Sequence, residues 1–244
     1  MEKTSKIFTL MLMIAALNSD AQIKGEKLEF GLGLSPSVSW VTSNSKMIKP
    51  NNAGVNWGFG ARINYNLSEK YAFGFEINLQ NIASNIHFDL IGVKPQNLPL
   101  DTSTDFNIKY RLRYLEVPCL LKMRTQNKNN RSYYGEFGIA LGFLLKQRAD
   151  ISSLQLNLED VNTGAPDDGD KFELQNSLDG SKYNYAINSL RAGLVFGAGT
   201  QLYILNDSRL DLGLRYNMGL SDFLDESKWS ATNSYLSVNA GFFF

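Results

Sequence analysis

The sequence predicts an all-β fold, a single antiparallel up-and-down transmembrane β-barrel of eight strands that follows a cleaved signal peptide. Three observations predict it. Apolar and polar residues alternate with a period of two along most of the chain, as strands with two different faces require. The first residues have the order of a secretory signal. The chain ends on Phe242, Phe243 and Phe244, an aromatic run that a soluble domain rarely exposes.

Residues 1–21 are the predicted signal peptide. Lys3 and Lys6 provide a positive start, residues 7–17 form a short apolar stretch, and residues 19–21 offer a cleavage site with small flanking residues. The apolar stretch is too short to cross a bilayer as a helix, which takes about 20 residues. The barrel domain is then expected to comprise residues 22–244.

Composition excludes several classes of protein. Acidic and basic residues number 24 each, so no net field favours nucleic acid, and no nucleic-acid partner is expected. Cys119 is the only cysteine, which excludes an intrachain disulfide and a thiolate metal cluster. No cofactor-binding motif is found, and no cofactor is expected.

Eight alternating segments give the predicted strands: residues 27–41, 54–67, 71–89, 106–124, 133–146, 188–204, 210–220 and 235–244.

The first four segments differ in phase and regularity. Apolar residues occupy even positions in the first segment and odd positions in the second and third. The third changes phase near residues 81–84, which predicts a β-bulge. The fourth contains Pro118, which cannot donate a ladder hydrogen bond and so predicts a local irregularity.

The last four segments complete an even strand count. Apolar residues occupy odd positions in the fifth and even positions in the sixth, seventh and eighth, and the seventh alternates most cleanly. The eighth places Phe242 and Phe244 on its apolar face, and we expect it to close against the first strand.

The connections alternate in length. Short turns are predicted near residues 68–70, 125–131 and 206–208, and longer ones near residues 42–53, 90–105, 150–186 and 222–230. Outer-membrane barrels have short periplasmic turns and longer external loops, so both termini are expected in the periplasm. A soluble lipocalin-type barrel would reverse inside and outside, and alternation alone does not distinguish the two. The predicted signal, the aromatic strand ends and the Gly-rich polar face favour the membrane.

Aromatic residues cluster near the predicted strand ends, as in the girdles of membrane barrels. The expected external set is Trp40, Trp57 and Trp229, and the expected periplasmic set is Tyr65, Tyr71, Tyr133, Tyr203 and Phe244.

The polar face carries acidic and basic residues in equal number. We expect them to form a structural network of salt bridges that fills the lumen, because eight strands leave little room for water. An ion pathway or small pore is the alternative. The residues are Glu29, Arg62, Glu76, Glu116, Lys122, Glu136, Lys146, Arg191, Asp211 and Arg215.

Two other features bear on chemistry. His87 with Asp89 is the minimum of a His–acid pair for a surface lipid- or peptide-modifying enzyme, although a hydrogen-bonded rim histidine is the commoner case. Residues 167–170, with Glu173, are rich in carboxylates but lack the spacing of an EF-hand, which favours a solvated loop. No catalytic or metal-binding residue is therefore predicted.

Residues 114–122, Tyr-Leu-Glu-Val-Pro-Cys-Leu-Leu-Lys, resemble the Tyr-Leu-Glu-Ile-Pro-Leu-Leu-Leu-Lys strand of PorT-like outer-membrane β-barrel proteins of Bacteroidetes. Residues 134–142 resemble the Gly-rich strand that follows it. The resemblance implies a non-enzymatic protein of the outer membrane, in contact with its lipid and lipopolysaccharide, structural or interacting through its loops. It also implies an alternative role as an accessory component of type IX secretion and gliding, with secretion-system or surface proteins as partners.

The C-terminal strand resembles the signal that the barrel-assembly machinery recognises in Gram-negative outer membranes. The resemblance makes Phe242 and Phe244 the predicted assembly signal and that machinery a predicted partner.

Overall fold

The computed structural model describes residues 27–43, 48–89, 105–153, 163–164, 172–175, 182–185, 187–205, 208–224 and 230–244. The predicted signal peptide lies outside these residues. The strands are β1 (Leu28–Ser43), β2 (Ile48–Pro50), β3 (Gly54–Asn66), β4 (Tyr71–Asp89), β5 (Asp105–Arg124), β6 (Arg131–Ser153), β7 (Thr163–Gly164), β8 (Phe172–Gln175), β9 (Lys182–Tyr185), β10 (Leu190–Leu205), β11 (Ser208–Gly219) and β12 (Ala231–Phe243). No helix in this part of the chain is long and apolar enough to cross a membrane.

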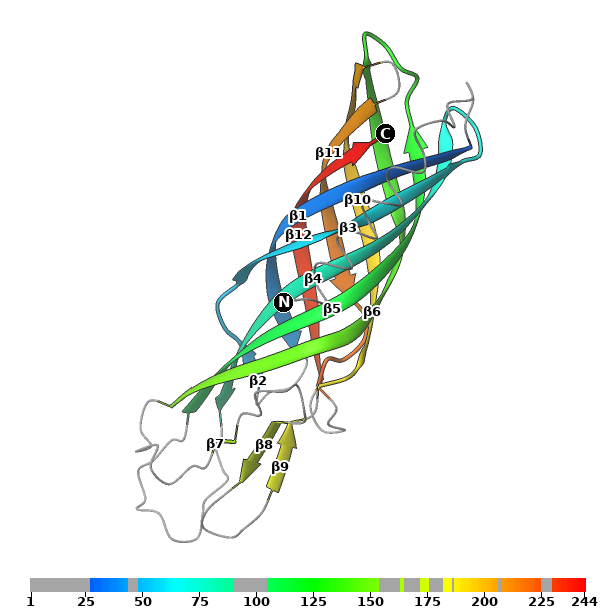
Figure 1. Cartoon of the computed structure of the whole chain (residues 1–244). Helices are drawn as coiled ribbons and strands as arrows, with labels where there is room; N and C mark the ends of the chain where they lie inside the picture. Colours follow the sequence, from blue (N-terminus) through cyan, green and yellow to red (C-terminus); the bar gives the residue numbers. More distant parts are fainter. Residues whose placement is uncertain are drawn as a thin grey trace, which may run out of the picture.

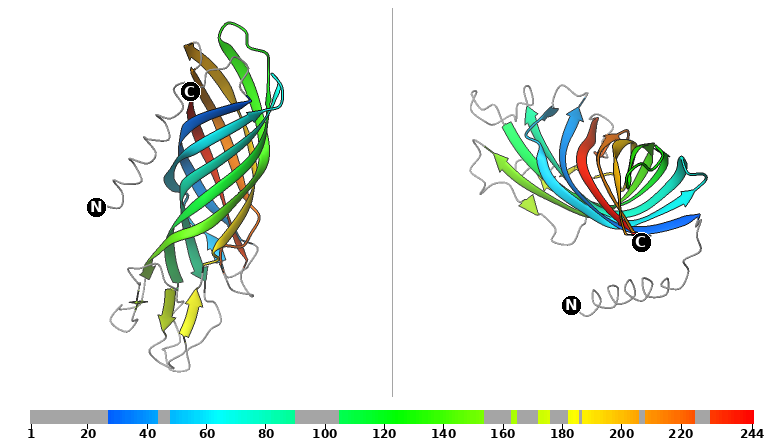
Figure 2. Two further views of the ribbon diagram at one scale, coloured as in Figure 1. Left: turned by 45° about the vertical axis from the view of Figure 1, so that its right-hand side comes forward. Right: turned by 90° about the horizontal axis from the view of Figure 1, so that it is seen from above.

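Eight long strands close into an antiparallel barrel, as predicted. The order runs β4-β3-β1-β12-β11-β10-β6-β5, and pairing of β4 with β5 completes the circle. The first and last long strands are neighbours, with Gly31 opposite Phe243. The strands run obliquely around an elongated wall (Figures 1 and 2).

Two additions to the barrel escaped the sequence analysis. The short β2 pairs with β4 through Lys49 and His87, beyond the last residues of β4 that pair with β3. β7, β8 and β9 form a separate three-stranded sheet, which Figure 1 shows beyond the end of the barrel opposite the C-terminus. Both lie within segments predicted as long connections.

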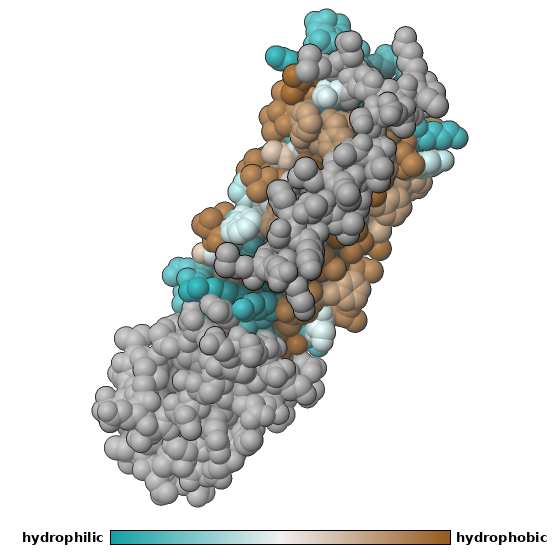
Figure 3. All heavy atoms as spheres, in the orientation of Figure 1, coloured by the Kyte–Doolittle hydropathy of each residue, from teal (hydrophilic) through white to brown (hydrophobic). Residues whose placement is uncertain are grey.

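The two faces of the wall have opposite polarity. Even positions of β3, β4 and β5 and odd positions of β1, β11 and β12 face inward. Through the middle of the barrel these inward positions hold mainly polar, charged or glycine residues, with the buried Leu120 of β5 as an exception. Large apolar side chains point outward, such as Ile77, Ile139 and Leu214 at 51–57% exposure. Figure 3 shows the resulting apolar surface between hydrophilic ends. A wall of this polarity faces hydrocarbon.

The prediction of a β-bulge near residues 81–84 is wrong. β4 and β5 keep one register from Tyr71 opposite Met123 to Asp89 opposite Asp105. What changes there is the polarity of the faces: Ile82 and Ile86 continue the inward series of Gln80, and Asn81 and Asn85 lie on the outward side. An inversion of polarity mimics a shift of phase in the sequence.

A real register shift occurs between β5 and β6, where Arg113 pairs with Lys146 and Tyr114 pairs with Leu144. Leu145 is the extra residue of this bulge. The irregularity expected at Pro118 is present, because the pairing of β4 with β5 passes from Phe75–Cys119 to Asn78–Glu116 without the pairs between them.

An apolar cluster fills the inside of the barrel at the end with the long connections. Ile82, Ile86, Tyr110, Leu112 and Tyr114 from β4 and β5 pack there with residues from other strands and from the segments beside them. These further members are Val41, Ile187, Phe223, Leu224, Ala231 and Tyr235. The barrel therefore has a hydrophobic core at one end and a mainly polar lumen elsewhere, in which Leu120, Ala140 and Val195 form a small second apolar cluster.

The predicted aromatic girdles are found in part. Trp57, Tyr65, Tyr71, Tyr133 and Phe244 are exposed on the outside, at 38–65% of their surface. Trp40 stacks on Tyr216, with ring centroids 5.9 Å apart. Tyr203 contradicts the prediction, because it pairs with the inward-facing Arg209 and its ring lies 6.0 Å from that guanidinium. Trp229 lies outside the described residues.

Candidate functional site: the charged lumen

Arg215 occupies the centre of the lumen and binds two carboxylates. Its terminal nitrogens hydrogen-bond both oxygens of Glu76, at 2.7 and 2.8 Å, and Nε bonds Glu136 at 2.7 Å. The three residues come from β11, β4 and β6, and each is at most 5% exposed. A two-pronged arginine–carboxylate pair of this kind is both strong and geometrically specific. It ties together three strands that are not neighbours in the wall.

Two further cations complete the central group. Arg62 Nε lies 3.6 Å from Glu76, and its Nη2 donates to Asn239 Oδ1 at 2.9 Å. Lys122 Nζ lies 3.5 Å from Glu136 and 3.8 Å from Asp211. Since isolated charges are costly to bury, this close pairing of both signs offsets part of the cost of burying them.

A second group lies near the short turns. Arg209 binds Glu29 with both terminal nitrogens at 2.9 Å and Asp211 through Nε at 2.7 Å. Arg124 adds a contact to Glu29 at 3.2 Å. The guanidinium of Arg209 also lies 4.6 Å from the ring centroid of Phe243, which faces inward and is 2% exposed. The middle phenylalanine of the C-terminal run is thus part of the lumen.

A third group lies next to the apolar cluster. Arg191 binds Glu116 at 2.7 Å and Asn217 at 2.8 Å. The hydroxyl of Tyr235 donates to the other oxygen of Glu116 at 2.5 Å. Every one of these residues is at most 4% exposed. Tyr235 belongs to the apolar cluster as well, so it joins the two kinds of interior.

The lumen holds the predicted charged residues with one exception. Lys146 is on the outside, because the bulge at Leu145 reverses the faces of β6 beyond that point. Arg124 and Arg209 are lumen residues that the sequence analysis missed. The odd-position parity of β11 would have identified Arg209, had the predicted strand begun one residue earlier. Arg124 is the last residue of β5 and shares the even parity of Lys122, so alternation would have identified it as well.

The glycines of the wall make room for these side chains. A Cβ at Gly33 would lie 2.3 Å from Nε of Arg62, and one at Gly241 would lie 2.4 Å from its Nη1. A Cβ at Gly197 would lie 2.7 Å from Glu136. The glycines of the polar face therefore leave the space that the long charged side chains fill.

The arrangement is suited to closing the lumen. Cations and carboxylates are paired within it, unlike the lining of a single sign that a selective pore uses. Among the residues that the structure describes, no group of three or more His, Cys, Asp or Glu side chains is placed to hold a metal ion. Residues 167–170, the centre of the acidic stretch, lie outside that part of the chain. His87 lies in β4 opposite Lys49 of β2, and Cys119 is a half-buried free thiol in β5.

A family model described as "Outer membrane protein beta-barrel domain" matches residues 19–225. The chain belongs to this family. The apolar outer surface and polar interior of the wall agree with this membership. The protein is accordingly an outer-membrane β-barrel. No curated protein matches the chain in a sequence comparison.

Several solved structures resemble the chain at low identity. OprG of Pseudomonas aeruginosa is 12% identical with a TM-score of 0.46, over 91% of this chain and 99% of that protein. Neisserial surface protein A is 12% identical with a TM-score of 0.41, over 89% and 98%. The outer membrane protease OmpT of Escherichia coli is 8% identical with a TM-score of 0.41, over 93% and 99%.

Proposed function

We propose that this protein is a non-enzymatic barrel of the outer membrane with a plugged lumen, which acts through the segments at the end with the long connections. One observation carries the proposal: the interior is filled by the three charged groups and, at the end with the long connections, by the apolar cluster. Because the strands enclose a filled interior, binding to other molecules is left to the connecting segments. This makes the barrel a membrane anchor for those segments.

The proposal includes an orientation. Both ends of the described wall, Leu28 and Phe244, lie with the short turns at residues 67–70 and 125–130, and the longer connections lie at the other end. Short turns on the periplasmic side are the rule for such barrels, which supports periplasmic termini.

Conductance across a planar bilayer tests the plug. We expect the purified protein to conduct at background level, because its lumen charges are paired and its far end is packed with apolar side chains. Steady channels in the unchanged protein would overturn the proposal.

We also propose that β12 presents the assembly signal to the barrel-assembly machinery. Phe242 and Phe244 point outward with centroids 6.4 Å apart, and the amide of Phe244 donates to Phe30 of β1 at 3.0 Å. Phe244→Asp should lower the level of folded protein in the outer membrane several-fold, measured by its change of gel mobility on boiling. Leu236→Asp is the matched control on the same face of β12. An equal loss of folded protein in both variants would mean that a charge on the lipid-facing side, and not the loss of an assembly signal, lowers the level.

We infer from residues 114–122 that the chain lies in the PorT-like group of the family. The structure gives the motif a physical role: Glu116 and Lys122 face the lumen and bind Arg191 and Glu136 respectively. An accessory role in type IX secretion rests on the resemblance alone. Normal secretion in a clean deletion strain would remove it.

A further inference from the structure

Basic side chains line the outside of the wall just beyond the apolar surface. Lys109, Arg111 and Arg113 occupy alternate positions of β5, all on the outward face and all exposed. Lys146 joins them from β6, because the bulge turns it outward. Four cations thus share one patch on two adjacent strands.

The pairing of β5 with β6 brings like charges face to face. Arg113 lies directly opposite Lys146. Like charges at opposite positions destabilise a sheet. Nε of Arg113 donates to a neutral acceptor, Oδ1 of Asn81, at 3.0 Å. Within the described part of the chain, neither Arg113 nor Lys146 has an ion pair with another described residue, in contrast to the cations of the lumen.

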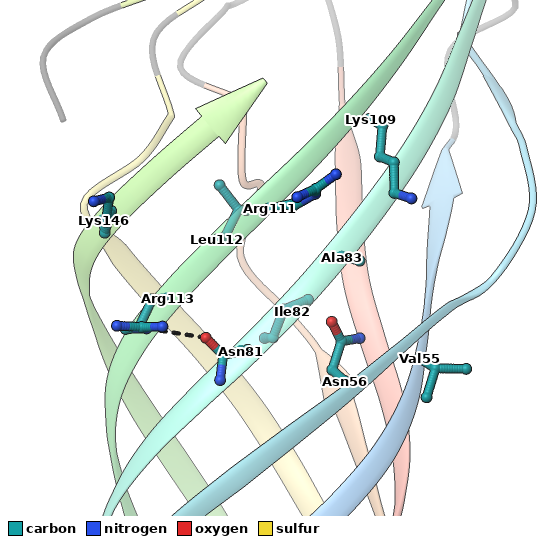
Figure 4. Close-up of a pocket in the computed structure, with 10 residues that line it drawn as sticks. All are labelled: Val55, Asn56, Asn81, Ile82, Ala83, Lys109, Arg111, Leu112, Arg113 and Lys146. Atoms are coloured by element: carbon teal, nitrogen blue, oxygen red, sulfur yellow. Dashed lines mark hydrogen bonds between the residues drawn. The ribbon is translucent and has the colours of Figure 1, made fainter. Parts of the chain in front are cut away.

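A groove adjoins these cations. It encloses about 460 Å³ and is lined by the four cations together with Val55, Asn56, Asn81, Ile82, Ala83 and Leu112 (Figure 4). The groove exists because β3 and β4 separate beyond Gly58 and Gln80, the last pair in their register. Asn81 holds one margin by donating to the carbonyl of Trp57 at 2.8 Å.

The two walls of the groove differ in chemistry. Val55 of β3 is 84% exposed and provides an apolar wall, while Arg113 and Lys146 lie on the opposite side (Figure 4). A ligand that fits both walls carries an anionic group beside an apolar or sugar portion. Arginine with a neighbouring lysine is a strong combination for phosphate, because the guanidinium binds two oxygens at once.

The height of the patch on the wall identifies the source of such a ligand. Phe143 and Leu145 on β6 are exposed apolar residues immediately before Lys146, and Leu115 on β5 comes two residues after Arg113. Two residues of a strand span about 7 Å. The cations therefore lie one step beyond the hydrocarbon surface, at the level of lipid headgroups.

We propose that this groove binds the phosphorylated headgroup of a glycolipid of the outer leaflet, with Arg113 and Lys146 holding the phosphate. The assignment of the leaflet rests on the orientation given under the proposed function. The bound phosphate neutralises Arg113 and Lys146, and the sugar portion of the headgroup lies against Val55.

The binding test uses the full barrel in detergent micelles and diphosphorylated lipid A as the probe. The double variant Arg113→Gln with Lys146→Gln should weaken binding of lipid A at least tenfold. Dephosphorylated lipid A should bind the unchanged protein as weakly as lipid A binds the variant. The matched control is Lys128→Gln with Arg131→Gln, which removes two exposed cations at the opposite end of the wall.

Three results would overturn the proposal: unchanged affinity in the double variant, an equal loss in the control, or inorganic phosphate that competes with lipid A at comparable concentration. The last would indicate a site for free phosphate. All four substituted side chains are exposed, so both variants should fold, and a gel shift on boiling confirms it.

Orientation is measured separately. In a Cys119→Ser background, Thr42→Cys should react on whole cells with a maleimide that does not cross membranes, and Lys128→Cys should not. The reverse result would refute the proposed orientation while leaving the binding measurement intact, and the phosphate would then belong to a lipid of the inner leaflet.

Discussion

The middle of the barrel and its end beyond the lipid are built from the same strands with opposite polarity. In the middle of β4 the inward residue is Glu76 and the outward residue is Ile77, whereas near its end Ile86 faces inward and Asn85 lies on the outward side. The register of β4 with β5 is the same in both regions. The medium outside the wall therefore decides which face is apolar: lipid demands an apolar exterior, and water demands an apolar core.

The largest expected effect concerns the charges of the middle region. Arg215→Leu leaves Glu76 and Glu136 buried without their main partner, so the free energy of unfolding should fall by about 3–5 kcal/mol. Urea unfolding in lipid vesicles, followed by tryptophan fluorescence, measures it. Arg113→Leu at the exposed end should change stability by less than about 1 kcal/mol. Similar losses in both would mean that the lumen network does not depend on burial.

The second effect concerns the outer surface. Leu214→Arg places a charge on the lipid-facing side of the middle region and should cost roughly 2–4 kcal/mol. Thr42→Arg places the same side chain on the outer side of β1 near its end, where water is expected, and should be close to neutral. The same unfolding assay compares them. Equal losses of stability in the two variants would contradict the assignment of lipid around the middle of the wall and water around its end.

The third effect concerns the inside of the far end. Leu112 is 1% exposed within the apolar cluster. Leu112→Ala should destabilise the protein by about 2 kcal/mol, near the lower end for a buried leucine, because the cluster lies at an end of the barrel. The loss of protection should be local. Hydrogen exchange by mass spectrometry should show it in the part of β5 that precedes Tyr114 more than in the middle of the wall.

The smallest effect compares crowding inside and outside the wall. Gly33→Ala brings a methyl group against the buried guanidinium of Arg62 and should cost about 1 kcal/mol. Gly135→Ala meets no atom within 4 Å and should be neutral. A thermal gel-shift series resolves the difference. If Gly33→Ala proved neutral too, Arg62 would have more freedom than its contacts indicate.

Sequence reasoning predicted the strands and their faces because alternation is a local property. The predicted and observed long strands agree to within a few residues at most ends, and the inward charges from Glu29 to Arg215 share one face as expected. Even Pro118 disturbed the ladder where its missing donor predicted.

What the sequence could not supply depends on the medium and on neighbouring strands. The inversion at residues 81–84 requires knowing where the lipid ends. The bulge at Leu145 is a property of the pair β5–β6, and neither strand alone contains a signal for it. The lumen partners are equally nonlocal: parity places Glu76 and Arg215 inside the barrel, but only the closed barrel brings them together.

The separations along the chain of these partners bear on how the barrel forms. Glu29 meets Arg209 across 180 residues, and Glu76 meets Arg215 across 139. Contacts between distant segments slow folding, because the chain pays the entropy of loop closure before they form. Until β12 pairs with β1, an inserted half-barrel would also hold unneutralised charges next to hydrocarbon. Partly closed states are thereby penalised, and closure should be a cooperative, late step that joins the two ends of the chain.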